Sequence, residues 1–453
     1  MMNSKSLMIG ALLFCLLATR AVPASADRRK IEPADEARID AWVDREIPGL
    51  LETYRHLHAH PELSLEEEKT AAFVANSLGD AGYSVETGIG GHGVIGVLEN
   101  GAGPTLLIRG DMDGLPVTEA TGLPYASVIR TKNSDGAIVG TMHACGHDIH
   151  VTNLLGTARL LASMKSVWGG TLIILAQPAE EVGLGALMMI DDGLFDRIAK
   201  PDQGIALHVD GNLPSGTIGY VPGWAAANVD SVKITIYGRG GHGARPHQTI
   251  DPIVTSAHLV TALQTIVSRR VDPSESAVVT VGSIHGGAKN NVIPDEVRLE
   301  LTVRSYTDEV RQLLLASIED MARETCNVFG CPRPPEVWIK PDSTPAMFND
   351  PELVAEGVSV FQELLGEENV SEIAATMTGE DFGRYTRHGN FPTFLYRLGS
   401  ALPKRWEESE AGGDPLPSLH SSRYAPDLEP TLRTGLRSMS RLALSLLGTP
   451  ATE

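Results

Sequence analysis

Several short apolar runs in the first half of the chain end in acidic or histidine side chains. The segments 105–113, 170–181 and 203–209 each have the length and composition of a buried strand and deliver Asp, Glu or His at or near their C-terminal ends. Segment 153–164 has apolar positions spaced by three and four, and 35–60 predicts one long amphipathic helix. This alternation predicts an α/β fold with a mainly parallel sheet covered on both faces, in which ligands bind at the carboxyl ends of the strands.

From about Val229 the pattern changes to strands in which polar and apolar positions alternate. Strands and helices then follow in the order βαββαβ, which is typical of a compact two-layer module of the ferredoxin-like type. Because 453 residues exceed the usual size of a single core, we expect a first domain at 27–224 and 339–453 with this module inserted at 225–338. The segments that predict the module are 229–238, 251–270, 277–287, 296–306, 307–326 and 335–340.

The first 26 residues have the pattern of a secretory signal peptide. Lys5 precedes an apolar run, and Ala24, Ser25 and Ala26 form a small-x-small cleavage site. A membrane anchor is the alternative, but the run is too short to span about 30 Å of hydrocarbon. We therefore expect an exported, periplasmic or secreted protein with no membrane span in the mature chain.

The charge of the chain excludes two classes of partner. The predicted signal peptide contains two basic residues and no acidic one, so its removal changes the formal net charge from −20 to −22. Such an acidic surface disfavours binding to nucleic acid and to anionic membranes. The mature chain keeps Cys145, Cys326 and Cys331. In an oxidising compartment the last two can pair, and the sequence leaves open whether they do.

Three clusters of metal-ligand side chains lie at or near the ends of predicted elements. Thiolate and imidazole are ligands that zinc prefers, and burial of two adjacent carboxylates costs several kcal/mol unless a cation compensates them. Each cluster has a structural alternative: a buried cysteine beside histidines, a solvated acidic loop, or a core histidine. Together they favour a metal site. The clusters are Cys145 with His147 across the turn-permitting Gly146, Glu180 with Glu181, and His208.

Eight motifs occur in the order found in a known family. They are RGDMDGLPV, MHACGHDIHV, QPAEEVGLGA, ALHVDGNLPSG, GRGGHGARPH, KNNVIP, MTGEDFGRY and PSLHSSRY. With them the chain resembles the metallo-aminoacylase and carboxypeptidase family over roughly residues 36–445. The more specific match is the amidohydrolase branch, which includes hippurate hydrolases and indole-acetyl-amino-acid hydrolases. The resemblance implies a di-metal catalytic domain with an inserted lid and dimerisation domain.

The same resemblance implies a set of site residues. Two divalent metal ions per chain would be held by five ligands, with Cys145 as the bridge. The thiolate favours zinc, while the carboxylate and imidazoles also admit manganese, cobalt or nickel. Glu180 would be the general base, and Asp113 would orient a ligand rather than bind metal. The five ligands implied by the resemblance are Cys145, His147, Glu181, His208 and His420.

Residues of the lid domain would complete the site. His242 matches a histidine that the partner subunit supplies to the oxyanion in this family, which implies a homodimer formed through the lid domain. Arg304, helped by Asn291, could bind the free carboxylate of the substrate. His143 and His150, by contrast, are interpreted as structural or as partners of the ligands.

These residues predict hydrolysis of the amide bond of N-acyl amino acids, including N-aroyl ones, to a carboxylic acid and a free amino acid. An exported metallo-dipeptidase or carboxypeptidase of the same family is the alternative. Two further hypotheses are a cysteine hydrolase with Cys145 as nucleophile, which would be indifferent to chelators, and a binding protein that has lost catalysis. The presence of every expected ligand and of Glu180 disfavours the last.

Overall fold

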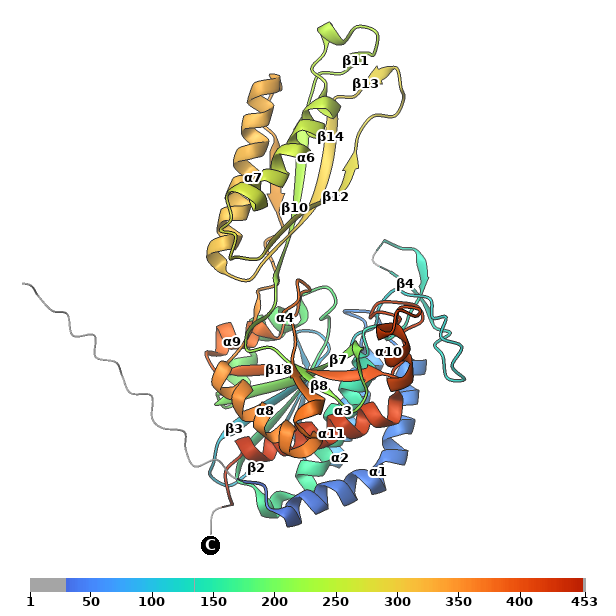
Figure 1. Ribbon diagram of the computed structural model, residues 1–453, viewed down its shortest axis with the longest axis vertical. Helices are drawn as coiled ribbons and strands as arrows, with labels where there is room; N and C mark the ends of the chain where they lie inside the picture. Colours follow the sequence, from blue (N-terminus) through green and yellow to red (C-terminus); the bar gives the residue numbers. More distant parts are fainter. Residues whose placement is uncertain (1–29, 134, 451–453) are drawn as a thin grey trace, which may run out of the picture.

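The structure is a computed structural model in which residues 30–133 and 135–450 are described. A large α/β domain lies at one end and a smaller, elongated one at the other (Figure 1). The two connections between them run side by side, because β9 (Gly223–Ala226) pairs antiparallel with β16 (Met347–Asn349). The signal peptide predicted at 1–26 lies outside the described residues and stays a prediction.

The large domain is built on an eight-stranded sheet in the order β1-β2-β6-β3-β7-β18-β8-β17. Its four central strands, β6, β3, β7 and β18, are parallel neighbours, which confirms the mainly parallel α/β fold. The strands are β1 (Ser84–Ile89), β2 (Gly93–Asn100), β3 (Thr105–Asp111), β6 (Gly170–Gln177), β7 (Gln203–Pro214), β8 (Ile218–Tyr220), β17 (Val370–Glu372) and β18 (Thr393–Ala401). A short hairpin, β4 (Arg130–Lys132) with β5 (Ile138–Gly140), stands apart.

Helices cover both faces of this sheet. The larger core cluster joins one face, through Leu207 and Leu398, to α1, α2, α3, α8 and α11. A second cluster joins the opposite face, through Ala206 and Leu395, to α4, α5 and α9. Since successive strand residues alternate faces, His208 shares the second face. The helices are α1 (Pro33–Ala59), α2 (Glu68–Asp80), α3 (His147–Ser163), α4 (Gly185–Asp191), α5 (Leu194–Arg197), α8 (Pro351–Leu365), α9 (Gly383–Gly389), α10 (Pro403–Glu410) and α11 (Leu428–Leu446).

The smaller domain has the expected βαββαβ order. Its four strands form an antiparallel sheet in the order β12-β14-β10-β15, and two helices pack on one face of it through a separate core. The expected limits of this module, 225 and 338, lie close to the start of β10 and the end of β15. Its elements are β10 (Asn228–Tyr237), β11 (Gly241–His242), α6 (Pro252–Arg269), β12 (Ala277–His285), β13 (Val292–Ile293), β14 (Glu296–Ser305), α7 (Asp308–Phe329) and β15 (Glu336–Ile339).

Local capping signals set the helix boundaries of the smaller domain. The Asp251 carboxylate accepts hydrogen bonds from the first backbone N–H groups of α6, and the Thr307 hydroxyl does the same for α7. Helix α7 ends at Gly330, whose φ of 68° is the left-handed conformation that glycine adopts readily. Asp251 and Thr307 therefore mark where the two helices begin, and Gly330 marks where α7 ends and the chain turns back to the sheet.

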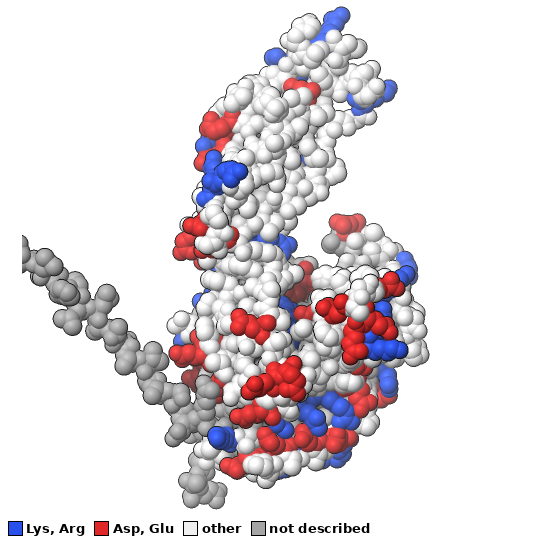
Figure 2. All heavy atoms as spheres, viewed as in Figure 1, with Lys and Arg blue, Asp and Glu red and all other residues white. Residues whose placement is uncertain are grey.

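Acidic side chains gather over the large domain on the face shown in Figure 2, as the net charge of −20 leads one to expect. Among the described residues, no helix combines the length and apolar character needed to cross a membrane. Cys145, Cys326 and Cys331 are free thiols in this structure.

Candidate metal centre

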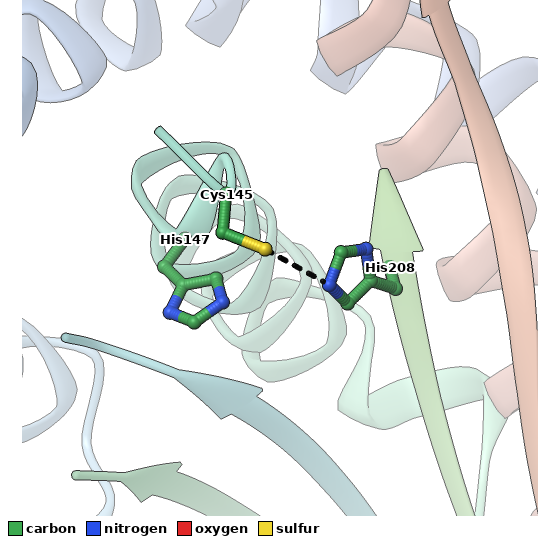
Figure 3. Close-up of side chains that lie close together, drawn as sticks. All are labelled: Cys145, His147 and His208. Atoms are coloured by element: carbon green, nitrogen blue, oxygen red, sulfur yellow. Dashed lines mark hydrogen bonds between the residues drawn. The ribbon is translucent and has the colours of Figure 1, made fainter. Parts of the chain in front are cut away.

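Cys145 and His147 face the same space because the chain turns sharply between them. Gly146 has a φ of 78°, and a side chain there would clash with Val209. His147 is the first residue of α3, so its ring lies at the start of the helix. His208 projects from β7 towards the Cys145 sulfur (Figure 3). The turn that Gly146 was expected to permit is therefore present.

Glu180, Glu181 and His420 reach the same place from loops. The acids follow β6 in a turn held by hydrogen bonds to its own backbone, and Ala179 there has a φ of 53° and donates its N–H to the Glu67 carboxylate at 2.7 Å. His420 also has a positive φ, 66°, and its backbone N–H donates to the Ala144 carbonyl oxygen at 2.8 Å. Both loops thus contain a non-glycine residue in the left-handed conformation. This conformation is costly and persists only where the surrounding structure holds the backbone in place.

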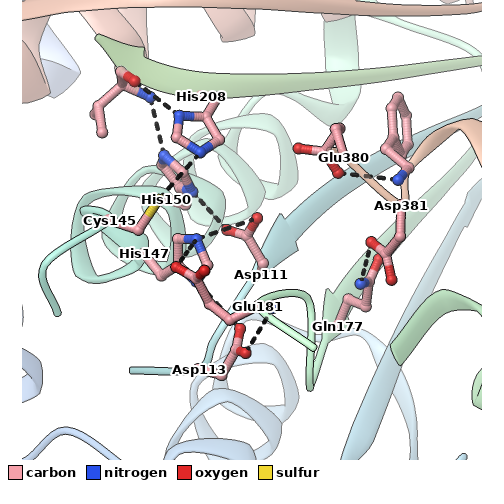
Figure 4. A network of polar contacts seen from close by, with 12 residues as sticks. Asp111, Asp113, Cys145, His147, His150, Gln177, Glu181, His208, Glu380 and Asp381 are labelled. Atoms are coloured by element: carbon pink, nitrogen blue, oxygen red, sulfur yellow. Dashed lines mark hydrogen bonds and ion pairs between the residues drawn. The ribbon is translucent and has the colours of Figure 1, made fainter. Parts of the chain in front are cut away.

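The structure brings all five predicted metal ligands together. The Cys145 Sγ lies 3.5 Å from His208 Nε2 and 3.3 Å from His420 Nε2. The Glu181 Oε1 lies 3.5 Å from His420 Nε2 and 3.8 Å from His147 Nε2. Cys145 belongs both to a group with His147 and His208 and to a group with Glu181 and His420, in each of which the ligand atoms lie within 4.8 Å of one another. Cys145 is therefore common to both groups, and Figure 4 shows it beside His147 and His208. Its role as a bridging ligand stays a prediction.

The donor set fits a pair of divalent metal ions. His147 Nε2 and Glu181 Oε1 are buried and have no hydrogen-bond partner, although buried polar atoms are normally satisfied. One thiol, three imidazoles and a carboxylate are the side chains that zinc and similar transition metals bind. A cation among them would satisfy the unpaired atoms.

Asp113 orients His147 rather than joining the ligand cluster. Its Oδ1 lies 3.1 Å from His147 Nδ1, which leaves Nε2 of that ring facing the cluster. The other oxygen, Oδ2, accepts hydrogen bonds from the Ser64 hydroxyl at 2.6 Å and from the Glu181 backbone N–H at 3.0 Å. Carboxylates that hold metal-binding histidines in this way are a common supporting feature of metal sites.

His150 and His208 are oriented by the backbone and by Asp111. His150 Nδ1 lies 2.5 Å from Asp111 Oδ1, and its Nε2 accepts the Val209 N–H at 3.0 Å, so both ring nitrogens are engaged. His208 Nδ1 lies 2.7 Å from the Val209 carbonyl oxygen, so Nε2 faces Cys145. Burial, and next the Arg397 guanidinium, lower the pKa of His208, which favours the neutral imidazole that a metal requires.

Burial disfavours the charged forms of the acidic side chains of the site. Burial raises the pKa of Glu180 well above its usual range, and the carboxylates of Glu380, Glu181 and Asp381 raise it further. Burial raises the pKa of Glu181 to about 7, even though the His147 imidazole lowers it. Burial and the Glu181 carboxylate likewise raise the pKa of the Cys145 thiol. A divalent cation would reverse these shifts, because it favours the charged form of every one of these groups.

Sequence reasoning missed a buried ion cluster next to the site. Arg109 lies inside the sheet, and its guanidinium contacts Asp111 at 2.7 Å, Glu380 at 3.0 Å and Asp381 at 3.1 Å. Gln177 joins it through a hydrogen bond of 3.0 Å. The cluster holds the Asp111 carboxylate on one side and, on the other, the carboxylate of Glu380, which lines the cavity. The only sequence signals were an arginine within an apolar strand and two adjacent acids in MTGEDFGRY.

A cavity of about 690 Å³ opens beside the ligand cluster and reaches the smaller domain. Glu180, Glu181, Cys145, His208 and His420 line it, together with residues of the smaller domain that include Arg304. The guanidinium of Arg304 donates from Nη1 to the Met377 carbonyl oxygen and from Nε to the Thr302 hydroxyl, both at 3.0 Å. A pocket of this size accommodates a small-molecule substrate.

His242 and Asn291 do not line this cavity. They lie together at the far end of the smaller domain, where β11 pairs with β13 (Figure 1). The Gly243 backbone N–H donates to the Asn291 carbonyl oxygen at 2.9 Å, which ties these two segments together. Within one chain these residues are remote from the ligands, so the roles expected for them stay predictions.

Comparison with known proteins places the site in a matched region. Residues 107–409 match the protein family described as Peptidase family M20/M25/M40. This segment contains four of the five predicted metal ligands and Glu180, and His420 follows it.

The chain is similar to several other proteins over most of their length. It is 39% identical over 345 residues to hippurate hydrolase of Campylobacter jejuni, covering 75% of this chain and 85% of that protein. It is 33% identical over 414 residues to thermostable carboxypeptidase 2 of Saccharolobus solfataricus, covering 90% and 96%. Among solved structures, a dinuclear metal-binding peptidase of the M20 family from Bacillus subtilis matches with a TM-score of 0.70 and 28% identity, covering 89% of this chain and 98% of that one.

Proposed function

Since the chain belongs to peptidase family M20/M25/M40 and is a metal-dependent hydrolase, we propose that it cleaves the amide bond of N-acyl amino acids, including N-aroyl ones. The products are a carboxylic acid and a free amino acid. The observation that carries this proposal is the position of Glu180, which lies in one cavity with the ligand cluster and with Arg304.

Cys145, His147, Glu181, His208 and His420 would hold two divalent ions, of which zinc or manganese suits the donor set best. Bound there, the ions supply Lewis-acid polarisation of the scissile carbonyl. Glu180 takes the proton from the attacking water and passes it to the leaving nitrogen. Arg304 binds the free carboxylate of the amino acid through its planar guanidinium, which places the amide next to Glu180.

The proposed enzyme is a homodimer. His242 of the partner subunit donates a hydrogen bond to the oxyanion that forms at the carbonyl carbon, and Asn291 of the partner subunit assists in binding the substrate. The distant position of both residues within one chain supports a contribution across subunits. Export through the segment 1–26 would place the enzyme in the periplasm or outside the cell.

A carboxypeptidase is the second candidate, because the similarity to thermostable carboxypeptidase 2 extends over 90% of the chain. The two activities differ in the acyl part of the substrate, which is a peptide for a carboxypeptidase and a simple carboxylic acid for a hydrolase of N-acyl amino acids. We expect kcat/KM for N-benzoylglycine to exceed that for a tripeptide with a free amino terminus by at least about tenfold. Glycine release and release of the C-terminal residue measure the two rates. The reverse order would favour the carboxypeptidase, and hydrolysis of neither would reject both.

A further inference from the structure

Arg397 enters the catalytic cavity from the floor of the large domain. It lies on β18, where its Cα is paired with that of His208 in the neighbouring parallel strand. In-register residues of parallel strands point to the same face, so the guanidinium lies beside the imidazole of a predicted ligand. Arg397 is half-buried and lines the cavity together with Cys145, His208 and His420.

No carboxylate forms an ion pair with Arg397 in the described part of the chain. Asp210 and Asp342 line the same cavity, yet neither pairs with it, and Asp210 instead accepts a hydrogen bond from the Asn212 backbone N–H. A half-buried guanidinium without an anion loses part of its hydration and gains no ion pair in return. Its five fixed N–H donors suit a planar carboxylate that enters the cavity with a ligand.

Arg304 and Arg397 approach the cavity from different domains. Arg304 projects from β14 of the smaller domain, where it also donates to the Met377 carbonyl oxygen. Arg397 belongs to the central sheet of the large domain. If Arg304 takes the carboxylate of the amino acid, as the proposed function requires, the acyl portion of the substrate extends past Glu180 towards the large domain and Arg397.

We propose that Arg397 binds a carboxylate carried by the acyl group, so that the preferred substrates are amino acids acylated by a dicarboxylic acid. This inference rests on the proposed function and adds the class of acyl group. The cavity of about 690 Å³ has room for such a chain. A site that pairs a polar group of its substrate discriminates strongly against an analogue lacking that group, because the guanidinium is then left without a partner.

Two substrates of matched length test this inference. N-succinyl-alanine carries a terminal carboxylate on its acyl group, and N-butanoyl-alanine ends in a methyl group. We expect wild-type kcat/KM for the succinyl compound to exceed that for the butanoyl compound by at least about tenfold. In Arg397→Gln this ratio falls by at least about tenfold, whereas Arg397→Lys keeps only part of it, because the positive charge remains but the paired N–H donors of the guanidinium are lost. Arg405→Gln, which removes an exposed arginine on α10, keeps the wild-type ratio.

Three results would overturn the inference. One is a wild-type enzyme that hydrolyses the butanoyl compound as well as the succinyl one. Another is an Arg397→Gln variant that loses both activities equally while its thermal unfolding is unchanged, since Arg397 would then serve the shared part of the substrate or support His208. The third is an unchanged ratio in Arg397→Gln.

A binding measurement separates failure of this inference from failure of the proposed function. If the metal-loaded enzyme hydrolyses neither of these compounds nor N-benzoylglycine, the proposed function is wrong. Calorimetry with succinate and with butanoate then decides about Arg397. Tighter binding of succinate that is lost in Arg397→Gln supports an anion site at this residue, and equal binding of both acids rejects it.

Discussion

At the scale of single residues, Glu180 and Glu181 are neighbours in the chain with different surroundings. Glu181 lies near the imidazoles of His147 and His420. Glu180 shares one group with His147 and Glu181, and a second group with the acids Glu380 and Asp381. A carboxylate that lies next to the predicted metal ligands, but is not grouped with most of them, is suited to proton transfer. This difference separates the predicted base from the predicted ligand.

We expect Glu180→Gln to lower kcat for N-benzoylglycine by about 10²- to 10⁴-fold, because the amide cannot accept the proton of the attacking water. Bound metal, measured by elemental analysis, and the unfolding temperature should stay close to those of the wild type. The exposed Glu410 on α10 provides the matched control, and Glu410→Gln should keep full activity. Activity retained in Glu180→Gln would reject the assigned base.

The sequence predicted the candidate ligands of the site but not most of the contacts that hold them in place. Each predicted ligand lies within a short motif, so neighbouring residues made it recognisable. Arg109 and Glu380, in contrast, are separated by 271 positions, and no local pattern connects them. Asp113 was expected to orient a ligand, and only the structure shows that its carboxylate contacts the predicted ligand His147 and accepts a hydrogen bond from Ser64.

At the scale of elements, the loop between β6 and α4 positions both acids. The sequence predicted a strand over 170–181, but β6 ends at Gln177. Pro178 has no N–H for the sheet, so the chain leaves the strand there and carries the acids into the cavity. Strand β7, by contrast, is longer than the predicted segment 203–209. It continues to Pro214, which pairs with Ala401 of β18. Such pairing between distant strands leaves no mark in either segment alone.

Gly185 is the residue that allows this loop to fold back. A Cβ there would lie 1.6 Å from the Pro178 carbonyl oxygen, a backbone atom. Gly185→Ala should therefore lower the free energy of unfolding by about 1–3 kcal/mol and displace the acids, with loss of bound metal. Chemical denaturation and elemental analysis measure the two effects.

Gly79 provides the matched control for this substitution. It lies on α2, and a Cβ there would meet nothing within 4 Å. Gly79→Ala should be neutral or stabilise the protein by about 0.5–1 kcal/mol, because alanine favours a helix. Equal effects of the two substitutions would show that close packing at Gly185 does not position the loop.

At the scale of the whole molecule, the smaller domain carries His242 far from the cavity of its own chain (Figure 1). In the proposed dimer each site combines Glu180 of one chain with His242 of the other. Glu180→Gln and His242→Ala homodimers should both be nearly inactive. A hybrid of the two has one complete site, so random assortment should restore about a quarter of wild-type activity. Native mass spectrometry would verify the exchange, and no recovery in exchanged samples would exclude a role across subunits.

The central claim is that two metal ions bound at the Cys145 cluster are required for hydrolysis. The most direct measurement is the metal content of the purified protein by elemental analysis, together with N-benzoylglycine hydrolysis before chelation, after chelation and after return of metal. The account predicts close to two metal ions per chain and activity that chelation removes and metal restores. A protein that binds no metal after reconstitution, or hydrolysis that persists after chelation and is stopped by thiol alkylation, would contradict it and favour Cys145 as a nucleophile.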